Sequence, residues 1–156
     1  MGRDYFLRMV DQIAALLEEI DQRQRSGDNS GAKAELNSRC EGAVGLDISQ
    51  IQRMSPEEVA NLLNTAGGLR QPRSITLASL LLKDAEIHAT DAVRVMIDRV
   101  HAFCLLADNV DQLDLDDQKV FQPKLREVGN QLSEFREHPY IGEKLRRLDR
   151  NDQTKT

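Results

Sequence analysis

Tryptophan is missing from this chain of 156 residues, and aromatic side chains make up only 4% of it. Surfaces that bind single-stranded nucleic acid interleave aromatic with basic side chains, and the basic segment 144–150 has only Tyr140 nearby. The net charge of −5 also opposes long-range attraction to phosphate backbones and to anionic lipid surfaces. We therefore expect neither a nucleic acid nor a membrane among the binding partners.

Cysteine is almost as scarce, with only Cys40 and Cys104. Two isolated cysteines lack the paired spacing of a structural zinc site, and each lies among apolar or small residues of a predicted helix. We expect both to be buried, reduced thiols. A chain of this length buries about two thirds of its unfolded surface in one core, so we expect a single domain without a metal ion or cofactor.

Long apolar runs are also absent. No segment approaches the roughly 18 consecutive apolar residues of a membrane-spanning helix. The chain opens with Met1-Gly2-Arg3-Asp4-Tyr5-Phe6, in which charged residues replace the apolar run of a signal peptide. We therefore predict a cytoplasmic protein.

Strand patterns are missing too, because the chain has no alternating apolar run and no Asn-Gly or Asp-Gly hairpin turn. Instead, apolar residues recur at steps of four and three, which places them on one stripe of an α-helix. A single helix cannot bury its own stripe, so the sequence predicts an all-α fold of packed helices. The three stripes are Phe6, Val10, Ile13, Leu17 and Ile20; Val93, Ile97, Val100, Cys104 and Ala107; and Phe121, Leu125, Val128, Leu132 and Phe135.

Capping residues divide the chain into helices. The clearest signal is Ser55-Pro56-Glu57-Glu58, in which Ser55 is the expected N-cap and Glu58 closes a capping box. A turn at Pro72 is expected to precede a helix that is apolar all round and therefore lies at the centre of the fold. The predicted helices span about 3–25, 31–44, 56–66, 75–88, 92–109, 115–137 and 139–148, with Asp91 and Asp114 expected at the starts of the helices at 92–109 and 115–137.

The organisation of the chain follows from these helices. Residues 1–149 are expected to form a single all-helical domain. Residues 150–156 lack an apolar anchor and are expected to form a disordered C-terminal tail.

Several segments resemble a known family. They are Asp4-Tyr5-Phe6-Leu7-Arg8-Met9-Val10-Asp11-Gln12-Ile13, then Gly45-Leu46-Asp47, Met54-Ser55-Pro56-Glu57-Glu58-Val59 and Leu62-Leu63. Up to about residue 110 the chain resembles a bacterial family of small all-helical, tetratricopeptide-repeat-like proteins of unknown function. The resemblance implies stacked antiparallel helix pairs and brings no known activity. The residues leave open whether the helices form such a superhelix or a compact bundle.

Candidate chemistry centres on His101, because Asp98 and Cys104 share its face of a predicted helix. A metal site would need further ligands from another helix, and the chain has no Glu-x-x-His pair. We therefore expect no metal ligand or catalytic residue here, and interpret His101 as a partly buried histidine paired with Asp98. His88 and His138 lie at predicted helix ends, where a capping role is expected.

Other familiar motifs fail. The acidic run 108–117 lacks the glycine and glutamate that a calcium-binding loop requires, so we expect a solvated turn that caps the neighbouring helices. No Gly-x-Ser-x-Gly, Gly-x-Gly-x-x-Gly or Gly-Lys-Ser/Thr motif occurs. The basic C-terminal segment, with Lys144, Arg146, Arg147 and Arg150, is explained by complementarity to a helix dipole.

Two functions remain. The favoured one is a protein–protein interaction or scaffold module that binds a protein or peptide on a concave face, with no enzyme activity. The alternative is a small helical enzyme or a ligand- or metal-binding bundle with its site near His101 and Cys104. The wide apolar face of helix 3–25 also permits a homodimer.

Overall fold

The computed structural model describes residues 2–65 and 70–154, with the side chains of 10–64 and 72–151. Within these ranges the fold is all-α, with no strand, as the sequence predicted. The helices are α1 (Gly2–Arg25), α2 (Asn29–Val44), α3 (Ile48–Gln52), α4 (Pro56–Thr65), α5 (Arg70–Ile87), α6 (Ala92–Asn109), α7 (Leu115–Asn130) and α8 (Pro139–Thr154), with short 3-10 helices at Val110–Gln112 and Ser133–Phe135.

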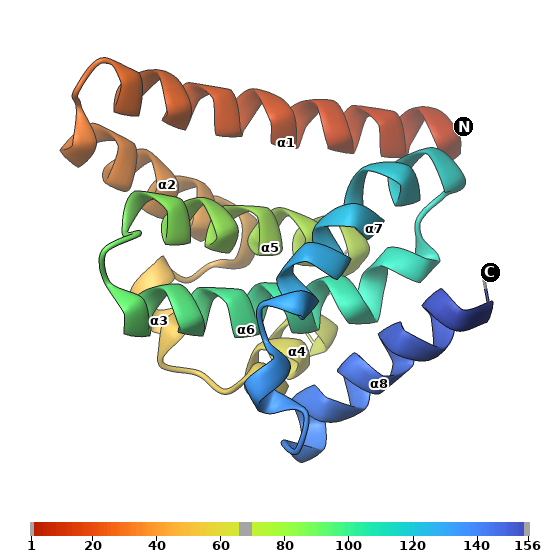
Figure 1. The fold of residues 1–156 in the computed structure, drawn as a ribbon. Coiled ribbons are helices and arrows are strands. Elements are labelled where there is room, and N and C mark those ends of the chain that lie inside the picture. Colours follow the sequence, from red (N-terminus) through yellow and green to blue (C-terminus); the bar gives the residue numbers. More distant parts are fainter. Residues whose placement is uncertain (1, 66–69, 155–156) are drawn as a thin grey trace.

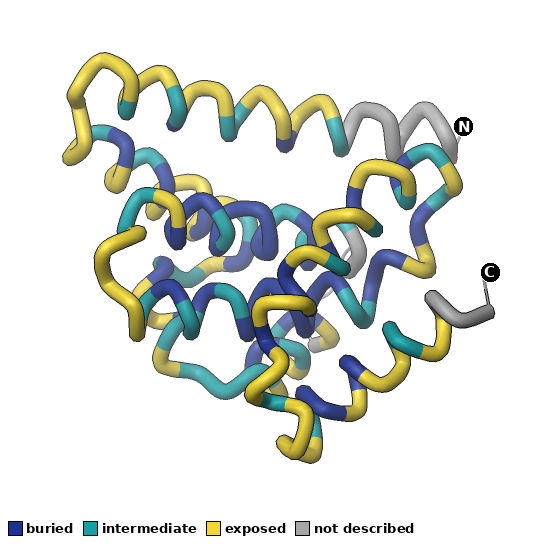
Figure 2. Tube along the Cα trace, viewed as in Figure 1, coloured by how far each residue is buried: buried dark blue, intermediate teal, exposed yellow. Residues whose placement is uncertain are grey.

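Helices α5 and α6 form the centre of the molecule. They run antiparallel, and their mutual contact is the most extensive between any two elements (Figure 1). Leu80 and Leu81 of α5 and Phe103 of α6 are fully shielded from solvent. Figure 2 shows that both helices are mostly buried. The prediction that segment 75–88 lies at the centre is confirmed.

The other helices surround this pair. Helices α1 and α2 form an antiparallel pair above α5, whereas α3, α4 and α8 pack below, against α6 (Figure 1). Helix α7 contacts α6 and reaches α1. The outward side of α1 is exposed along its described length, while Ile13 and Ile20 face the core.

Short polar contacts begin and end the helices at the predicted positions. The Ser55 hydroxyl accepts from the Glu58 amide at 3.1 Å, and the Glu58 carboxylate accepts from the Ser55 amide at 2.9 Å. Asp91 and Asp114 cap α6 and α7 through the third amide of each helix. Gly45 ends α2 with φ +83°, a left-handed conformation that glycine adopts without steric cost.

Two predicted helix boundaries are wrong. Helix α5 begins at Arg70, so Pro72 lies in its first turn, where amides have no partner within the helix and proline is tolerated. Helix α7 ends at Asn130 instead of residue 137. Gly129 and Asn130 are poor helix formers, and Leu132 is buried beyond the turn that they introduce.

Two further expectations are wrong, one about the burial of Val93 in α6 and one about where α8 ends. Val93 was placed on the buried stripe, but it is 71% exposed. The neighbouring Arg94 turns inward to pair with Asp84 of α5, and this rotation leaves Val93 on the outside.

Helix α8 extends to Thr154 rather than ending near Leu148, so residues 150–154 are helical where a disordered tail was expected. Arg150 lies 3.6 Å from Glu143, one of the ion pairs along this helix.

Candidate functional site

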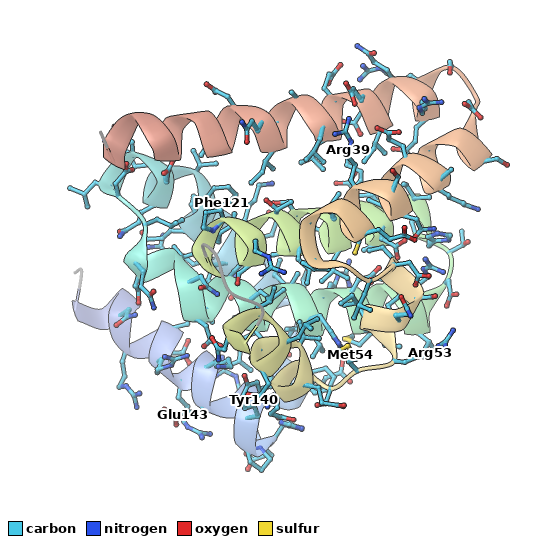
Figure 3. The ribbon with its side chains drawn as sticks, turned by 180° about the vertical axis from the view of Figure 1, so that it is seen from behind. Arg39, Arg53, Met54, Phe121, Tyr140 and Glu143 are labelled. Carbon is cyan, nitrogen blue, oxygen red and sulfur yellow. The ribbon has the colours of Figure 1, made fainter. Side chains whose placement is uncertain are left out.

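The face of α6 that carries Asp98, His101 and Cys104 points into the protein. These side chains are 0%, 5% and 3% exposed. The predicted pairing of His101 with Asp98 is wrong. The imidazole lies between two backbone carbonyl groups, with Nδ1 3.1 Å from the oxygen of Ile97 and Nε2 2.7 Å from that of Met54. Met54 lies in the connection between α3 and α4 (Figure 3), so His101 attaches this connection to α6.

Asp98 instead belongs to a polar cluster that joins three helices. Gln52, the last residue of α3, donates through Nε2 to Asp98 Oδ1 at 2.8 Å and to Asp84 Oδ2 at 3.0 Å. Arg94 donates to both oxygens of Asp84, with Nε and a terminal nitrogen each at 2.8 Å. We call Gln52, Asp84, Arg94 and Asp98 the buried carboxylate cluster, since Asp84 and Asp98 are 1% and 0% exposed.

The two carboxyl groups of this cluster have opposite titration behaviour. Burial is the largest single influence on Asp84 and disfavours its charged form, but the hydrogen bonds with Arg94 and Asp98 and the charge of Arg94 together outweigh it and hold the pKa of Asp84 below its ordinary value. Burial and the hydrogen bond with Asp84 raise the pKa of Asp98 to about 9. A single guanidinium therefore neutralises one of the two carboxyl groups.

Sequence reasoning missed this cluster because its members come from separate helices. Asp84 lies in segment 75–88, which was interpreted from the sequence only through its apolar residues. One signal was available: Lys83 and Asp84 interrupt an apolar segment that was expected to be enclosed, and buried charges are nearly always paired. Lys83 is indeed 8% exposed and lies 2.6 Å from both Asp21 and Glu86.

The two cysteines are buried as predicted. Burial raises the pKa of both the Cys40 and the Cys104 thiol to about 12. Because the thiolate is the reactive form, neither group is poised for nucleophilic chemistry at neutral pH.

His88 and His138 have different roles. His138 accepts through Nδ1 from the amides of Tyr140 and Ile141, both at 3.2 Å, so its predicted capping role is confirmed at the start of α8. The side chain of His88 lies beside the carboxylate of Asp84, with Nε2 3.6 Å from Oδ1. Burial lowers the pKa of His88, opposed by the charge of Asp84.

The acidic run 108–117 is only in part the solvated turn that the sequence predicted, since residues 111–112 and 115 are exposed but residues 109–110, 113 and 117 are buried. Asp108 lies 2.5 Å from Lys144 and 3.2 Å from Arg147, and Asn109 and Val110 are fully buried or nearly so. Asp114 caps α7 as expected. The run is therefore a packed connection that fastens α8 to the end of α6.

The basic residues of α8 are engaged within the chain. Lys144 is 7% exposed, and its Nζ lies 4.2 Å from the centroid of the Tyr140 ring. Arg146 and Arg150 lie 3.5 and 3.6 Å from Glu143, which Figure 3 shows on the outer side of the helix. The pairs with Glu143 lie within α8, whereas the contacts of Lys144 and Arg147 with Asp108 hold α8 against α6.

A groove opens between α1, α2 and α5, with a cavity volume of about 1130 Å³. Its apolar lining comes from all three helices. The part from α2 is made of small residues, and a Cβ built on Gly42 would meet no atom within 4 Å. The apolar and small lining residues are Ile13, Leu16, Ser38, Gly42, Ala43, Val44, Gly45 and Pro72.

Charged residues at the groove connect its walls. Arg39 of α2 donates to Glu35 at 3.0 Å and to Glu19 of α1 at 2.7 Å, and it stands between the two helices in Figure 3. Arg73 of α5 donates to the backbone oxygen of Ala43 at 3.1 Å. The groove therefore has walls that are fixed to one another by polar contacts across α1, α2 and α5.

Known motifs and proteins add little to this geometry. Within the described parts of the chain, no group of three or more His, Cys, Asp and Glu residues is placed to hold a metal ion. No helix among the described residues has the length and apolar character needed to cross a membrane. No family model matches the sequence, and it has no significant match to a curated protein or to a solved structure.

Proposed function

We propose that this protein is an interaction module that binds a helical segment of a partner protein in the groove between α1, α2 and α5. The observation that carries the proposal is the groove itself, which combines an apolar lining with an unfilled wall at Gly42. Grooves of this kind accept the apolar face of an amphipathic helix. The small residues along α2 allow the backbone of such a helix to approach closely.

The charge of the module favours a basic partner segment. The chain carries a net charge of −5, and the charged side chains at the groove are Glu19, Glu35 and Glu41 against Arg39 and Arg73. The charge of Arg39, on the same wall, is matched by Glu35 and Glu19. We therefore propose a partner helix with small or apolar residues on one face and lysine or arginine residues beside it, because complementary charge speeds association.

Selection of binding peptides, followed by a groove-filling variant, tests this proposal. The probe is a displayed library of helical peptides, each with one apolar stripe flanked by lysines. Gly42→Leu extends a side chain into the groove, whereas Ala34→Leu adds the same group to an exposed position of α2 outside the groove. Selected peptides should bind the wild type and Ala34→Leu equally, and Gly42→Leu at least about tenfold more weakly, or about 1.4 kcal/mol.

Three outcomes would overturn the proposal. The first is a library that yields no binder, and the second is a set of peptides that bind Gly42→Leu as tightly as the wild type. The third concerns homodimerisation. If sedimentation shows a dimer that Gly42→Leu dissociates, a second copy of this chain occupies the groove instead of a partner helix.

The proposed module acts in the cytoplasm, and its pairs α1–α2 and α5–α6 correspond to the stacked units of a tetratricopeptide-like array. Support for the pairing comes from the antiparallel contacts within each pair and from the contact of α2 with α5. The alternative function, an enzyme or ligand site near His101 and Cys104, gains no specific support. Both side chains are buried, and both ring nitrogens of His101 face backbone oxygens.

A further inference from the structure

One carboxyl oxygen of the buried carboxylate cluster receives no hydrogen bond from the described residues, so an ionised form of its carboxyl group is not stabilised there. Asp98 is 0% exposed, and its Oδ2 has no hydrogen-bond partner, while Oδ1 accepts from Gln52. A buried acceptor without a partner is costly, and a buried carboxylate without a matching cation is more so. A proton on Asp98 would remove both costs, because it cancels the charge and lets the carboxyl group donate to Asp84.

Among the side chains that the structure describes, none around Asp98 supplies a second cation. Helix α5 presents Asp84 and His88, α3 presents the neutral Gln52, and Arg94 of α6 is already paired with Asp84. Two groups of α2 also lie near the cluster. The charge of Lys33 lowers the pKa of His88, and Cys40 is a buried thiol whose pKa is raised. The negative charge of Asp84 is therefore neutralised by Arg94, whereas no described cation is left to neutralise an ionised Asp98.

We propose that Asp98 retains a proton in the folded protein at neutral pH, and that its loss under alkaline conditions releases α3 from α5 and α6. Helix α3 is the element that yields because it has only five residues and Gln52 ties it to both carboxyl groups. Moving α3 aside admits water to the second negative charge. The cluster is thus a pH-sensitive clamp, and it is independent of the groove.

The direction of the pH effect follows from the pKa of Asp98. Its value of about 9 in the folded chain is raised above the ordinary value of 3.8. Between these values the folded protein binds a proton that the unfolded chain has lost, so stability declines as pH rises and the loss is complete above the folded value. Burial and Asp114 raise the pKa of Asp117 to about 6, so Asp117 is already ionised where Asp98 still titrates.

Carbon-13 NMR of aspartate-labelled protein tests the proton directly. At pH 7.5 the wild type should show one protonated aspartate carboxyl group, and Asp98→Asn should lack it. Asp98→Asn is the matched variant because its amide can donate to Asp84 while its oxygen still accepts from Gln52. A wild-type spectrum in which every aspartate is ionised at that pH would overturn the proposal without any variant.

Hydrogen exchange tests the clamp. When the pH is one unit above the pKa of Asp98, the hydrogen-exchange protection factors of the Ile51 and Gln52 amides should fall about tenfold, after correction for intrinsic exchange. Asp98→Asn should change less than twofold over the same range. Equal losses in both proteins would show that α3 opens for another reason. If Asp98→Asn does not fold, Asp84→Asn provides the second test, because it frees Arg94 to pair with an ionised Asp98 and should abolish the protonated signal.

Discussion

The inner pair α5–α6 and the outer pair α1–α2 differ in how much of their helical surface is buried. The inner helices are enclosed on nearly every side and carry two buried carboxyl groups, those of Asp84 and Asp98. The outer helices bury one stripe each and leave a groove beside them. The same chain therefore has a centre that tolerates little change and an outer layer with room for a ligand.

This difference separates two kinds of polar contact. Asp84 and Arg94 are partly or fully withdrawn from water, so their pairing is costly to disrupt. Arg39 and Glu19 are 44% and 56% exposed, and exposed ion pairs contribute little to stability. Polar contacts hold both layers together, and in the inner pair the contact between Asp84 and Asp98 also helps to raise the pKa of Asp98.

The largest expected effect comes from creating a cavity in the inner pair. Leu81→Ala should reduce the free energy of unfolding by about 3 kcal/mol, because Leu81 is 0% exposed and its neighbours cannot close the gap. Leu17→Ala in α1 should cost only about 1 kcal/mol, since Leu17 is partly buried at the edge of the core. Urea unfolding of both variants measures the difference. Equal losses would show that the outer pair is as tightly packed as the inner one.

Local sequence rules predicted most of the helices of this fold. The caps at Ser55, Asp91 and Asp114 depend on residues within one turn, and the structure places all three as expected. The boundary at Asn130 was missed because the predicted helix followed the apolar stripe past the poor helix formers Gly129 and Asn130. Packing adds a reason for glycine at position 129. A Cβ on Gly129 would lie 3.1 Å from Phe103 of α6 and 2.9 Å from Leu148 of α8.

The candidate site was less predictable than the fold. Helical spacing placed Asp98, His101 and Cys104 on one face, but spacing within α6 does not reveal which side chains arrive from other helices. Gln52 and Asp84 lie 46 and 14 positions from Asp98 in the sequence. Only the arrangement of α3 and α5 brings them to the same carboxyl group.

An intermediate effect is expected from acid, through His101. Burial lowers the pKa of His101, although hydrogen bonds to the Met54 and Ile97 carbonyls oppose the shift. Its contribution to stability is therefore present above the unfolded pKa of about 6.5 and is lost as pH falls below it, by at most about 1.4 kcal/mol per pH unit.

Urea midpoints at pH 7 and pH 5 check this effect. The stability of the wild type relative to His101→Gln should fall between these values. The comparison with a variant is needed because Asp98 changes stability in the opposite direction over the same range. A difference between wild type and His101→Gln that stays constant with pH would contradict a buried neutral imidazole.

The smallest effect comes from adding one methyl group to a helical glycine of the outer pair, Gly42 of α2, and to one that packs on the inner pair, Gly129 of α7. Gly42→Ala should stabilise the protein by about 0.5–1 kcal/mol, because alanine restricts the unfolded chain and its Cβ enters open space beside the groove. Gly129→Ala should destabilise it by about 1 kcal/mol, since the same gain is outweighed by crowding against Phe103, which is 0% exposed. Thermal unfolding of the two variants should therefore shift in opposite directions. If both shift upward, Phe103 and Leu148 can move to accommodate the methyl group, and the inner packing is less rigid than its burial implies.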